Sequence, residues 1–349
     1  MNSRAITIGN RVIGGDEPCF IVAEVGANHD RKLSQAKQLI DVAVEAGADA
    51  VKFQVYSAET AYSRKTPQFS YLKELHENKS TYEIIKENEL PREWLGELAG
   101  YCQKKGIIFF ATPFDREAVD QLYDIGVPAY KWAAFEMVDL PLLRYASSKG
   151  KPMSLSTGMC NLADIQEAVD TVYATGNKDV ILLQCTSLYP TRINQVNLRM
   201  MDTLKDAFHV PVGLSDHTTG ITVPIAAAAR GACVIEKHYT LSRKLKGPDH
   251  PFAIEPEELK HMVRAIREVE ESLGSPVKQM IPEEAEMARL GRRSIIARVD
   301  IPKGTKLTED MIIIKRPGYG IKPKFLDIVI GREAKKDIEK DDIITWEMV

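Results

Sequence analysis

The sequence of 349 residues contains little cysteine, no long apolar run and almost no net charge. Its five cysteines are far apart and odd in number, which argues against a disulfide framework and a CxxC metal site. No apolar run approaches the ~20 residues that a membrane span needs, and residues 1–15 hold no apolar signal core. We therefore expect a cytoplasmic protein that has reduced cysteines and no membrane contact.

The charge and composition of the chain further limit the class of protein it can belong to. Lys and Arg number 46 against 49 Asp and Glu, so the net charge of -3 provides no general field for a polyanion. With 44% hydrophobic and 27% charged residues, the composition is that of a folded globular protein, and the length allows about two domains. Nucleic acid is therefore not an expected partner.

Short runs rich in Val, Ile and Phe alternate with helical patterns through most of the chain. The eight expected strands are residues 20–26, 50–56, 107–114, 129–135, 152–158, 180–187, 210–217 and 233–240. Eight βα units predict a parallel sheet that closes into a (β/α)8 TIM barrel. A doubly wound open sheet is the alternative, and it is disfavoured because no GxGxxG turn follows the first strand.

The alternation of strands and helices ends after Ser272. Residues 275–290 are turn-rich and charged, and they predict a linker between a barrel of residues 1–274 and a second domain of residues 291–349. A domain of about 60 residues has a marginal core, so we expect it to pack against something larger.

Polar residues recur where the expected strands end, and in a TIM barrel these ends form the catalytic mouth. Strand by strand they are Glu24; Lys52 and Gln54; Thr112; Lys131 and Glu136; Ser156 and Thr157; Ser187 and Tyr189; Ser215 and His217; Glu236 and His238. Each buried polar atom costs ~1 to 3 kcal/mol unless it is hydrogen-bonded, so a ring of them favours a functional site.

Two lysines, Lys52 and Lys131, lie inside apolar strands, where an ammonium is costly unless an anion meets it. One interpretation is a pair of structural ion pairs, and the other is a site for a small dianion or trianion. Four hydroxyl residues on other strands could complete a phosphate or carboxylate cradle: Thr112, Ser156, Ser187 and Ser215. This combination favours a phosphorylated acid as substrate.

Two histidines, His217 and His238, end the seventh and eighth expected strands, which are neighbours in a barrel. The period-two pleat places Ser215 beside His217 and Glu236 beside His238. A single histidine is more often structural, but a pair on adjacent strands beside carboxylates favours a divalent-metal site. Two imidazoles with oxygen ligands suit Mn, Fe or Zn and tolerate Mg, and we expect Mn or Mg.

Two loops belong to the same expected mouth. The connection over residues 57–91 is long for a βα loop, which is typical of a lid or binding loop. Residues 246–250 (KGPDH) fall in the last βα loop, where Asp249 would hang over the mouth.

The motifs at these strand ends carry a resemblance to a known family. They are AEVGANH (23–29), GADAVKFQ (47–54), ATPFD (111–115), LSTGM (155–159), CTSLYPT (185–191), GLSDHT (213–218), IEKHYT (235–240) and KRPGYGI (315–321). Over almost the whole chain the sequence resembles the N-acetylneuraminate (sialic acid) synthase family, which includes the legionaminate and pseudaminate synthases. The resemblance implies a (β/α)8 barrel followed by a small antifreeze-like (SAF) domain.

The implied reaction condenses phosphoenolpyruvate with an N-acylhexosamine such as N-acetylmannosamine, giving a nine-carbon 2-keto acid and phosphate. By motif, the residues that would hold phosphoenolpyruvate are Lys52, Thr112, Lys131, Ser156, Ser187 and Ser215. His217 and His238 would bind the metal, while the sugar would face Glu24, Tyr189 and Asp249. We add Gln54 to the substrate-binding set, and we assign catalytic roles to Glu24, Lys131 and Glu136, the last as the carboxylate near C2.

The resemblance also implies a head-to-tail homodimer. In it the SAF domain of one subunit would cover the barrel mouth of its partner, and Arg316 would act on the sugar in trans.

Three departures from the sialic acid synthase pattern leave the sugar open. The chain reads KWAAFE from Lys131, with Ala134 in place of a serine, and it has KFQ for KHQ and CTS for CTN. N-acylmannosamine and a 2,4-diacetamido-2,4,6-trideoxyhexose, the substrate type of legionaminate or pseudaminate synthases, therefore remain as candidates.

Two further functions are weighed against this one. A 3-deoxy-ulosonate phosphate synthase would want extra Arg or Lys at the mouth for a second phosphate. A non-catalytic carbohydrate-binding or ice-binding protein would have no need for two lysines and two histidines at strand ends.

Overall fold

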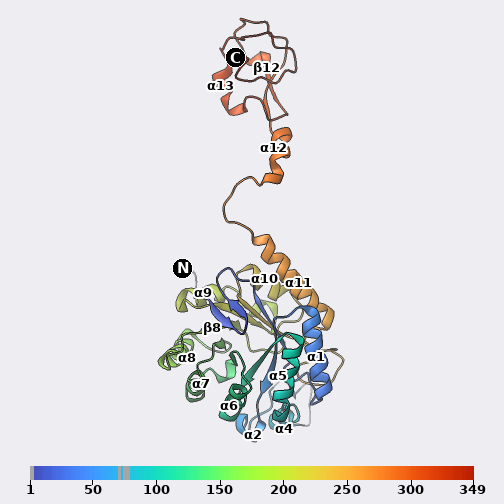
Figure 1. Ribbon diagram of the computed structural model, residues 1–349, viewed down its shortest axis with the longest axis vertical. Coiled ribbons are helices and arrows are strands. Elements are labelled where there is room, and N and C mark those ends of the chain that lie inside the picture. The colour runs from blue at the N-terminus through green and yellow to red at the C-terminus, as the bar shows by residue number, and fades with distance from the viewer. Residues whose placement is uncertain (1–3, 70–71, 74–78) are drawn as a thin grey trace. The chain divides into compact units, whose positions relative to one another are not determined.

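The computed structural model describes residues 4–69, 72–73 and 79–349. The chain divides into two compact units, Met1–Gly274 and Ser275–Val349 (Figure 1). The first unit carries the barrel, and the second unit has a hydrophobic core of its own.

Eight parallel strands form a closed barrel in the order β10-β3-β4-β5-β6-β7-β8-β9. Their bounds are β3 (Phe20–Glu24), β4 (Ala50–Val55), β5 (Ile108–Pro113), β6 (Tyr130–Trp132), β7 (Met153–Ser156), β8 (Val180–Cys185), β9 (Val212–Asp216) and β10 (Val234–His238). The expected TIM barrel is confirmed, because β10 pairs with β3 from Val234↔Phe20 to His238↔Glu24 and so closes the sheet. The open-sheet alternative is wrong.

Helices surround the barrel (Figure 1). They are α1 (Leu33–Ala46), α5 (Leu95–Lys105), α6 (Arg116–Asp124), α7 (Leu140–Ser147), α8 (Leu162–Ala174), α9 (Met200–Phe208), α10 (Thr222–Ala229) and α11 (Pro256–Leu273), with a 3-10 turn η3 (Ile193–Gln195). Local sequence sets their ends: Asp115 caps α6 by accepting the Ala118 N–H, and Gly47 ends α1 in the left-handed conformation. No helix in the described ranges is both long and apolar enough to cross a membrane.

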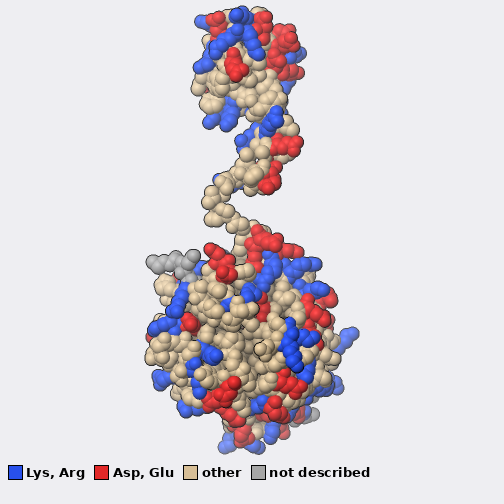
Figure 2. Space-filling view, in the orientation of Figure 1, with Lys and Arg blue, Asp and Glu red and all other residues tan. Residues whose placement is uncertain are grey.

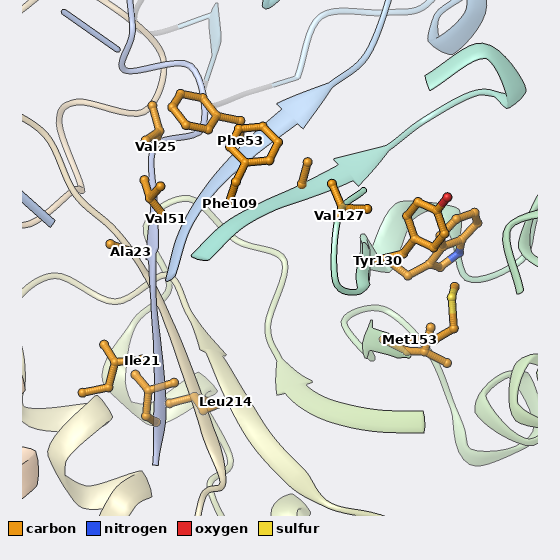
Figure 3. Close-up of a cluster of buried hydrophobic side chains, with 14 of the residues drawn as sticks. Ile21, Ala23, Val25, Val51, Phe53, Phe109, Val127, Tyr130, Met153 and Leu214 are labelled. Atoms are coloured by element: carbon orange, nitrogen blue, oxygen red, sulfur yellow. The ribbon is translucent and has the colours of Figure 1, made fainter. Parts of the chain in front are cut away.

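Successive side chains of each strand point to opposite faces of the sheet, so the apolar side chains form two separate clusters, one outside the barrel and one inside it. Side chains on the outer face pack against the helices, as Phe53 and Phe109 do with ring centroids 5.7 Å apart (Figure 3). Inward side chains near the strand starts, such as Phe20, Ile181 and Val234, form a second cluster. Many later inward positions are polar, among them Glu24 and Ser215, so the barrel has an apolar floor and a polar mouth.

A short antiparallel hairpin, β1 (Ile6–Ile8) and β2 (Arg11–Ile13), joins the apolar floor. Ile6, Ile8 and Ile13 belong to the same buried cluster as the inward residues of the barrel. The sequence analysis missed this hairpin because two strands of three residues carry too little alternation to be recognised.

The second unit is built on an antiparallel pair, β11 (Ser294–Ala297) and β12 (Ile312–Lys315). Its short helical elements are η4 (Pro282–Glu284), α12 (Ala285–Gly291), η5 (Glu309–Met311), η6 (Pro323–Phe325) and α13 (Leu326–Val329). Eleven buried apolar residues, among them Ile295, Leu307 and Ile344, form its core.

Within the expected linker over residues 275–290, the last part folds as α12. The Arg289 carbonyl oxygen accepts the Gly318 N–H at 2.7 Å, and the Gly291 carbonyl oxygen accepts the Arg316 Nε–H at 2.6 Å. A Cβ at Gly318 would lie 2.9 Å from the Ala288 carbonyl oxygen, so the glycine permits this close approach. The α12 helix therefore packs against the RPGYG segment of the second unit.

Charged side chains of both signs are interspersed over the face of the barrel unit seen in Figure 2. This mixture agrees with the net charge of -3, and no single-sign field dominates the visible face.

Gly213 on β9 lies so close to β8 and β10 that a substitution there tests how tightly the barrel strands pack. A Cβ there would collide with the Val234 carbonyl oxygen and lie 2.9 Å from Leu183 Cδ2, so we predict that Gly213→Ala destabilises the fold by roughly 1 to 3 kcal/mol. Gly100→Ala in α5, which meets no atom within 4 Å, should instead stabilise by about 0.4 to 1 kcal/mol. Urea unfolding of both variants checks the prediction, and equal stability of the two would contradict it.

Candidate active site

A cavity of about 1070 Å³ opens where the barrel strands end. Its lining includes these residues assigned from the sequence: Lys52, Gln54, Thr112, Lys131, Glu136, Ser156, Ser187, Tyr189, Ser215, His217, His238 and Asp249. Glu24 does not line the cavity among the described residues; it is fully buried beneath it and accepts a hydrogen bond from Gln54 at 2.6 Å. Arg316 lies in the second unit.

Two lysines and two carboxylates form a buried cluster at the base of the cavity. Glu236 Oε2 lies 3.0 Å from Lys52 Nζ, and Glu236 Oε1 lies 3.4 Å from Lys131 Nζ. Glu24 Oε2 lies 3.4 Å from Lys52 Nζ. The anion shared by the buried lysines is therefore Glu236, which the sequence analysis placed beside His238 at a strand end without linking it to the lysines.

The two carboxyl groups of the cluster differ in their affinity for a proton. Burial raises the pKa of Glu24 to about 7, although the charge of Lys52 opposes the shift. Burial would also raise the pKa of Glu236, but Lys131 and Lys52 outweigh it and lower that pKa to about 2. Glu236 thus stays ionised, whereas Glu24 can take up a proton near neutral pH. Burial also lowers the pKa of Lys131, although the charge of Glu236 opposes this shift.

Hydroxyl groups surround the ammonium groups. Lys131 Nζ donates to Ser156 Oγ at 2.7 Å, and Lys52 Nζ donates to Thr112 Oγ1 at 3.4 Å. Ser215 Oγ donates to Glu236 Oε1 at 3.0 Å. Cations and hydroxyl donors that converge on one cavity can hold a small phosphorylated or carboxylated anion.

Gly158, to which the sequence analysis gave no role, keeps this part of the cavity open. A Cβ at Gly158 would collide with Ser187 Oγ and lie 3.2 Å from both Ala134 Cβ and Cys185 Sγ. The signal for it was present in the LSTGM motif, but only the close approach of the ends of β6 and β8 explains why the residue has to be small.

The two histidines are neighbours, with ring centroids 5.4 Å apart. His217 Nδ1 donates to the Thr186 carbonyl oxygen at 2.9 Å, so Nε2 is the nitrogen left for another ligand. His238 Nδ1 is buried without a hydrogen-bond partner and lies 3.7 Å from Asp249 Oδ2. Burial lowers the pKa of His238, which keeps its ring neutral and able to ligate a cation.

Cys185 is a second feature that the sequence analysis left without a role. Its Sγ lies 3.9 Å from His217 Nδ1. Burial would lower the pKa of His217, but the contact with Cys185 outweighs it and the pKa is raised. A cation at His217 would therefore compete with a proton.

The histidine pair offers part of a metal site rather than a full ligand set. Within the described part of the chain, no three His, Cys, Asp or Glu side chains are grouped so that they could hold an ion by themselves. Two imidazoles would leave the remaining positions to water or substrate oxygens, which is typical of catalytic rather than structural metal sites.

Three other assigned residues form the walls. The Tyr189 ring packs against His217 and Phe252, with centroids 4.4 and 5.6 Å away. Asp249 Oδ2 accepts the Ala27 N–H at 2.9 Å. Burial, with the charge of Asp139, raises the pKa of Glu136 to about 7, so this carboxyl can exchange a proton near neutral pH.

The described part of residues 57–91 supplies one wall of the cavity. It contains α2 (Ala58–Ala61) and α4 (Thr81–Glu87), and the 3-10 turn η1 (Arg92–Trp94) follows it. Its large apolar lining residues are Tyr62, Phe69, Leu72, Ile84 and Ile85. The sequence analysis expected a lid or binding loop here but named none of these residues.

Two family models and several known proteins match this chain. The NeuB family model matches residues 39–278, and the SAF domain model matches residues 292–349. The chain is 40% identical over 351 residues to the N,N'-diacetyllegionaminic acid synthase of Legionella pneumophila, covering 97% of this chain and 99% of that protein. It is 38% identical over 344 residues to the human N-acetylneuraminate-9-phosphate synthase, covering 97% and 95%.

A solved structure agrees with these relatives. The N-acetylneuraminic acid (sialic acid) synthetase of Leptospira borgpetersenii, crystallised in complex with citrate, superposes with a TM-score of 0.73 at 37% identity. The match covers 82% of this chain and 95% of that one.

The buried lysine cluster leads to a prediction about anion binding. Loss of one partner of a buried ionic contact costs about 3 to 5 kcal/mol, so Lys131→Ala should weaken phosphoenolpyruvate binding at least ~100-fold. Lys149→Ala is the matched control, because that ammonium pairs with Asp120 at the surface and should not affect binding. Calorimetric titration measures both, with circular dichroism to check folding. Unchanged affinity in folded Lys131→Ala would refute the assignment.

Proposed function

The chain belongs to the NeuB family and carries a SAF domain, and from that premise we propose that it is a phosphoenolpyruvate-dependent nonulosonate synthase. Its substrates would be phosphoenolpyruvate and an N-acylhexosamine, and its products a nine-carbon 2-keto acid and phosphate. The observation that carries the proposal is the pair of buried lysines, Lys52 and Lys131, that share the carboxylate of Glu236 at the base of the cavity.

The reaction needs a nucleophilic carbon to be held over an aldehyde. C3 of phosphoenolpyruvate attacks the aldehyde carbon of the open-chain sugar, the aldehyde oxygen takes up a proton to become a hydroxyl, and the new C–C bond leaves oxocarbenium character at C2. Water adds to C2, and the resulting tetrahedral intermediate breaks its C2–O bond to phosphate, the C2 hydroxyl losing its proton as the ketone forms. In this scheme Lys52 and Lys131 hold the anionic groups of phosphoenolpyruvate, while deprotonated Glu136 takes the proton of the water.

The histidine pair suits a divalent cation, and Mn or Mg remains our expectation. The neutral His238 ring, whose buried Nδ1 has no hydrogen-bond partner, and the nearby His217 would hold it. The chemistry that such an ion supplies when bound is Lewis-acid polarisation of the sugar aldehyde.

The cavity lining bears on which sugar is used. Among its described residues the cations are Lys52, Lys131 and Arg192, and the first two already belong to the anion cluster. This leaves only the exposed Arg192 for a second phosphate, which disfavours a phosphorylated sugar.

The apolar wall from residues 57–91 suits a methyl group and acyl groups better than free hydroxyls. A 2,4-diacetamido-2,4,6-trideoxyhexose therefore fits better than N-acetylmannosamine.

A second subunit is supported by an exposed apolar rim on three successive loops after β6, β7 and β8. Its residues are Phe135, Val138, Met159, Leu162, Leu188 and Ile193. Exposed apolar patches of this kind mark interaction sites. The homodimer implied by the family resemblance would cover the rim with the partner's SAF domain and bring Arg316 to the sugar, whose oxygens suit the fixed donors of a guanidinium.

The proposed reaction is tested by phosphate release. With phosphoenolpyruvate and Mn, turnover should be fastest with the 2,4-diacetamido-2,4,6-trideoxyhexose, slower with N-acetylmannosamine and slowest with its 6-phosphate. EDTA should abolish turnover, and Mn or Mg should restore it. Absence of release with every acylated hexosamine would overturn the proposal, and full activity of metal-free enzyme would overturn its metal requirement.

Action of Arg316 in trans is tested by mixing two inactive variants, Arg316→Ala and Lys131→Ala. Under subunit exchange, one mouth of each mixed dimer receives an intact Lys131 and an intact Arg316 from its partner. We expect the mixture to recover up to about half the activity per mixed dimer, because one of its two mouths is complete. Persistent inactivity, when heterodimers are shown to form, would exclude action across the interface.

A further inference from the structure

A buried histidine of the last βα loop links that loop to the first one. His250 is fully buried, and its Nε2 donates to Asp30 Oδ1 at 2.8 Å. On the other side of the ring, Nδ1 lies 2.6 Å from Thr240 Oγ1. Asp30 follows β3, whereas Thr240 and His250 follow β10, so the imidazole joins two loops that are more than 200 residues apart in sequence.

The acidic partner of this contact is itself held in place. Gln35 Nε2 donates to Asp30 Oδ2 at 2.8 Å and to the Asn28 carbonyl oxygen at 2.7 Å. Burial would raise the pKa of Asp30, but the hydrogen bonds from His250 and Gln35 outweigh it and lower the pKa. Asp30 is therefore a charged acceptor for the imidazole, and charge-assisted hydrogen bonds are the stronger kind.

The residue before His250 is Asp249, which reaches the same first loop by a different contact. Asp249 Oδ2 accepts the Ala27 N–H and lies 3.7 Å from His238 Nδ1. A Cβ at Gly26 would collide with Asp249 Oδ2, so only a glycine lets this carboxylate approach the strand end. The carboxylate has little space in which to move.

Gly247 completes the contact from the other end of the GPDH motif. A Cβ at Gly247 would lie 2.9 Å from His250 Cδ2 and 3.3 Å from Nε2. The backbone therefore packs directly on the imidazole ring, and the turn between Gly247 and His250 carries Asp249 at a fixed place.

We infer that the Asp30–His250 contact latches the last βα loop onto the first one and thereby positions Asp249 for the sugar. His250 is a positioning residue, because it lines no described part of the cavity and acts through Asp249. The inference rests on the proposed function in one respect only, because that function identifies the ligand of Asp249 as an acylated sugar.

The test is a set of variants of the full chain. His250→Phe keeps a ring and removes both hydrogen bonds, so KM for the acylated hexosamine should rise about tenfold or more. KM for phosphoenolpyruvate should stay within about twofold, because Lys52 and Lys131 lie on other strands. His250→Gln, which keeps an N–H donor toward Asp30, should recover part of the loss.

A double-mutant cycle separates positioning from a general structural role. In an Asp249→Ala background, His250→Phe should raise the sugar KM no further, because the latch acts through the deleted carboxylate. Leu122→Ala removes a fully buried side chain of α6 away from the mouth, so it should lower the free energy of unfolding and leave both KM values unchanged. A fall in kcat alone, with both KM values unchanged, would overturn the inference.

Hydrogen exchange tests the latch without any activity. The peptide that contains Ala27 should exchange faster in His250→Phe and in Asp249→Ala, because both changes release its N–H. If the wild type turns over no sugar while this pattern appears, the proposed function has failed and the latch stands. Unchanged exchange in His250→Phe would overturn the latch, and Asp30→Asn serves as the second variant if His250→Phe does not fold.

Discussion

The burial of Lys52 and Lys131 opposite one carboxylate is the constraint on which the mouth of the barrel depends. An ammonium in an apolar strand is costly unless an anion meets it, and that anion is Glu236. Glu236 lies on β10, while the lysines lie on β4 and β6, so the contact crosses the barrel interior and exists only when the sheet is closed. When Glu24 is protonated, the two lysines share one carboxylate, and a second, exchangeable anion can complete the site.

The strand pleat explains how such a cluster coexists with a stable core. Outward positions build the apolar layer under the helices, and inward positions near the strand starts build an apolar floor with the β1–β2 hairpin. Farther along the strands the inward positions are polar, and Thr112, Ser156 and Ser215 donate or accept hydrogen bonds within the cluster. The apolar core and the candidate active site thus lie at different levels along the axis of the same barrel.

Loops far apart in sequence then shape the space above the cluster. The segment over residues 57–91 brings an apolar wall, while the GPDH turn brings Asp249 to His238 through contacts with the first loop. Glycines at 26, 158 and 247 allow these segments to approach, because a side chain at any of the three would meet a functional or positioning atom. Substrate preference in this fold therefore depends on how closely loops pack at the mouth.

The sequence by itself determined the eight strands, the closed barrel and most of the polar residues that line the cavity, because these follow from local alternation and from the position of polar residues at strand ends. Only the tertiary structure decided which carboxylate meets the lysines, that Glu24 lies beneath the cavity, and that residues 285–291 form a helix on the RPGYG segment. It also decided the contact of His250 with Asp30. The physical reason is the same in each case: these contacts join segments that are distant along the chain, and no periodicity within one segment encodes its partner in another.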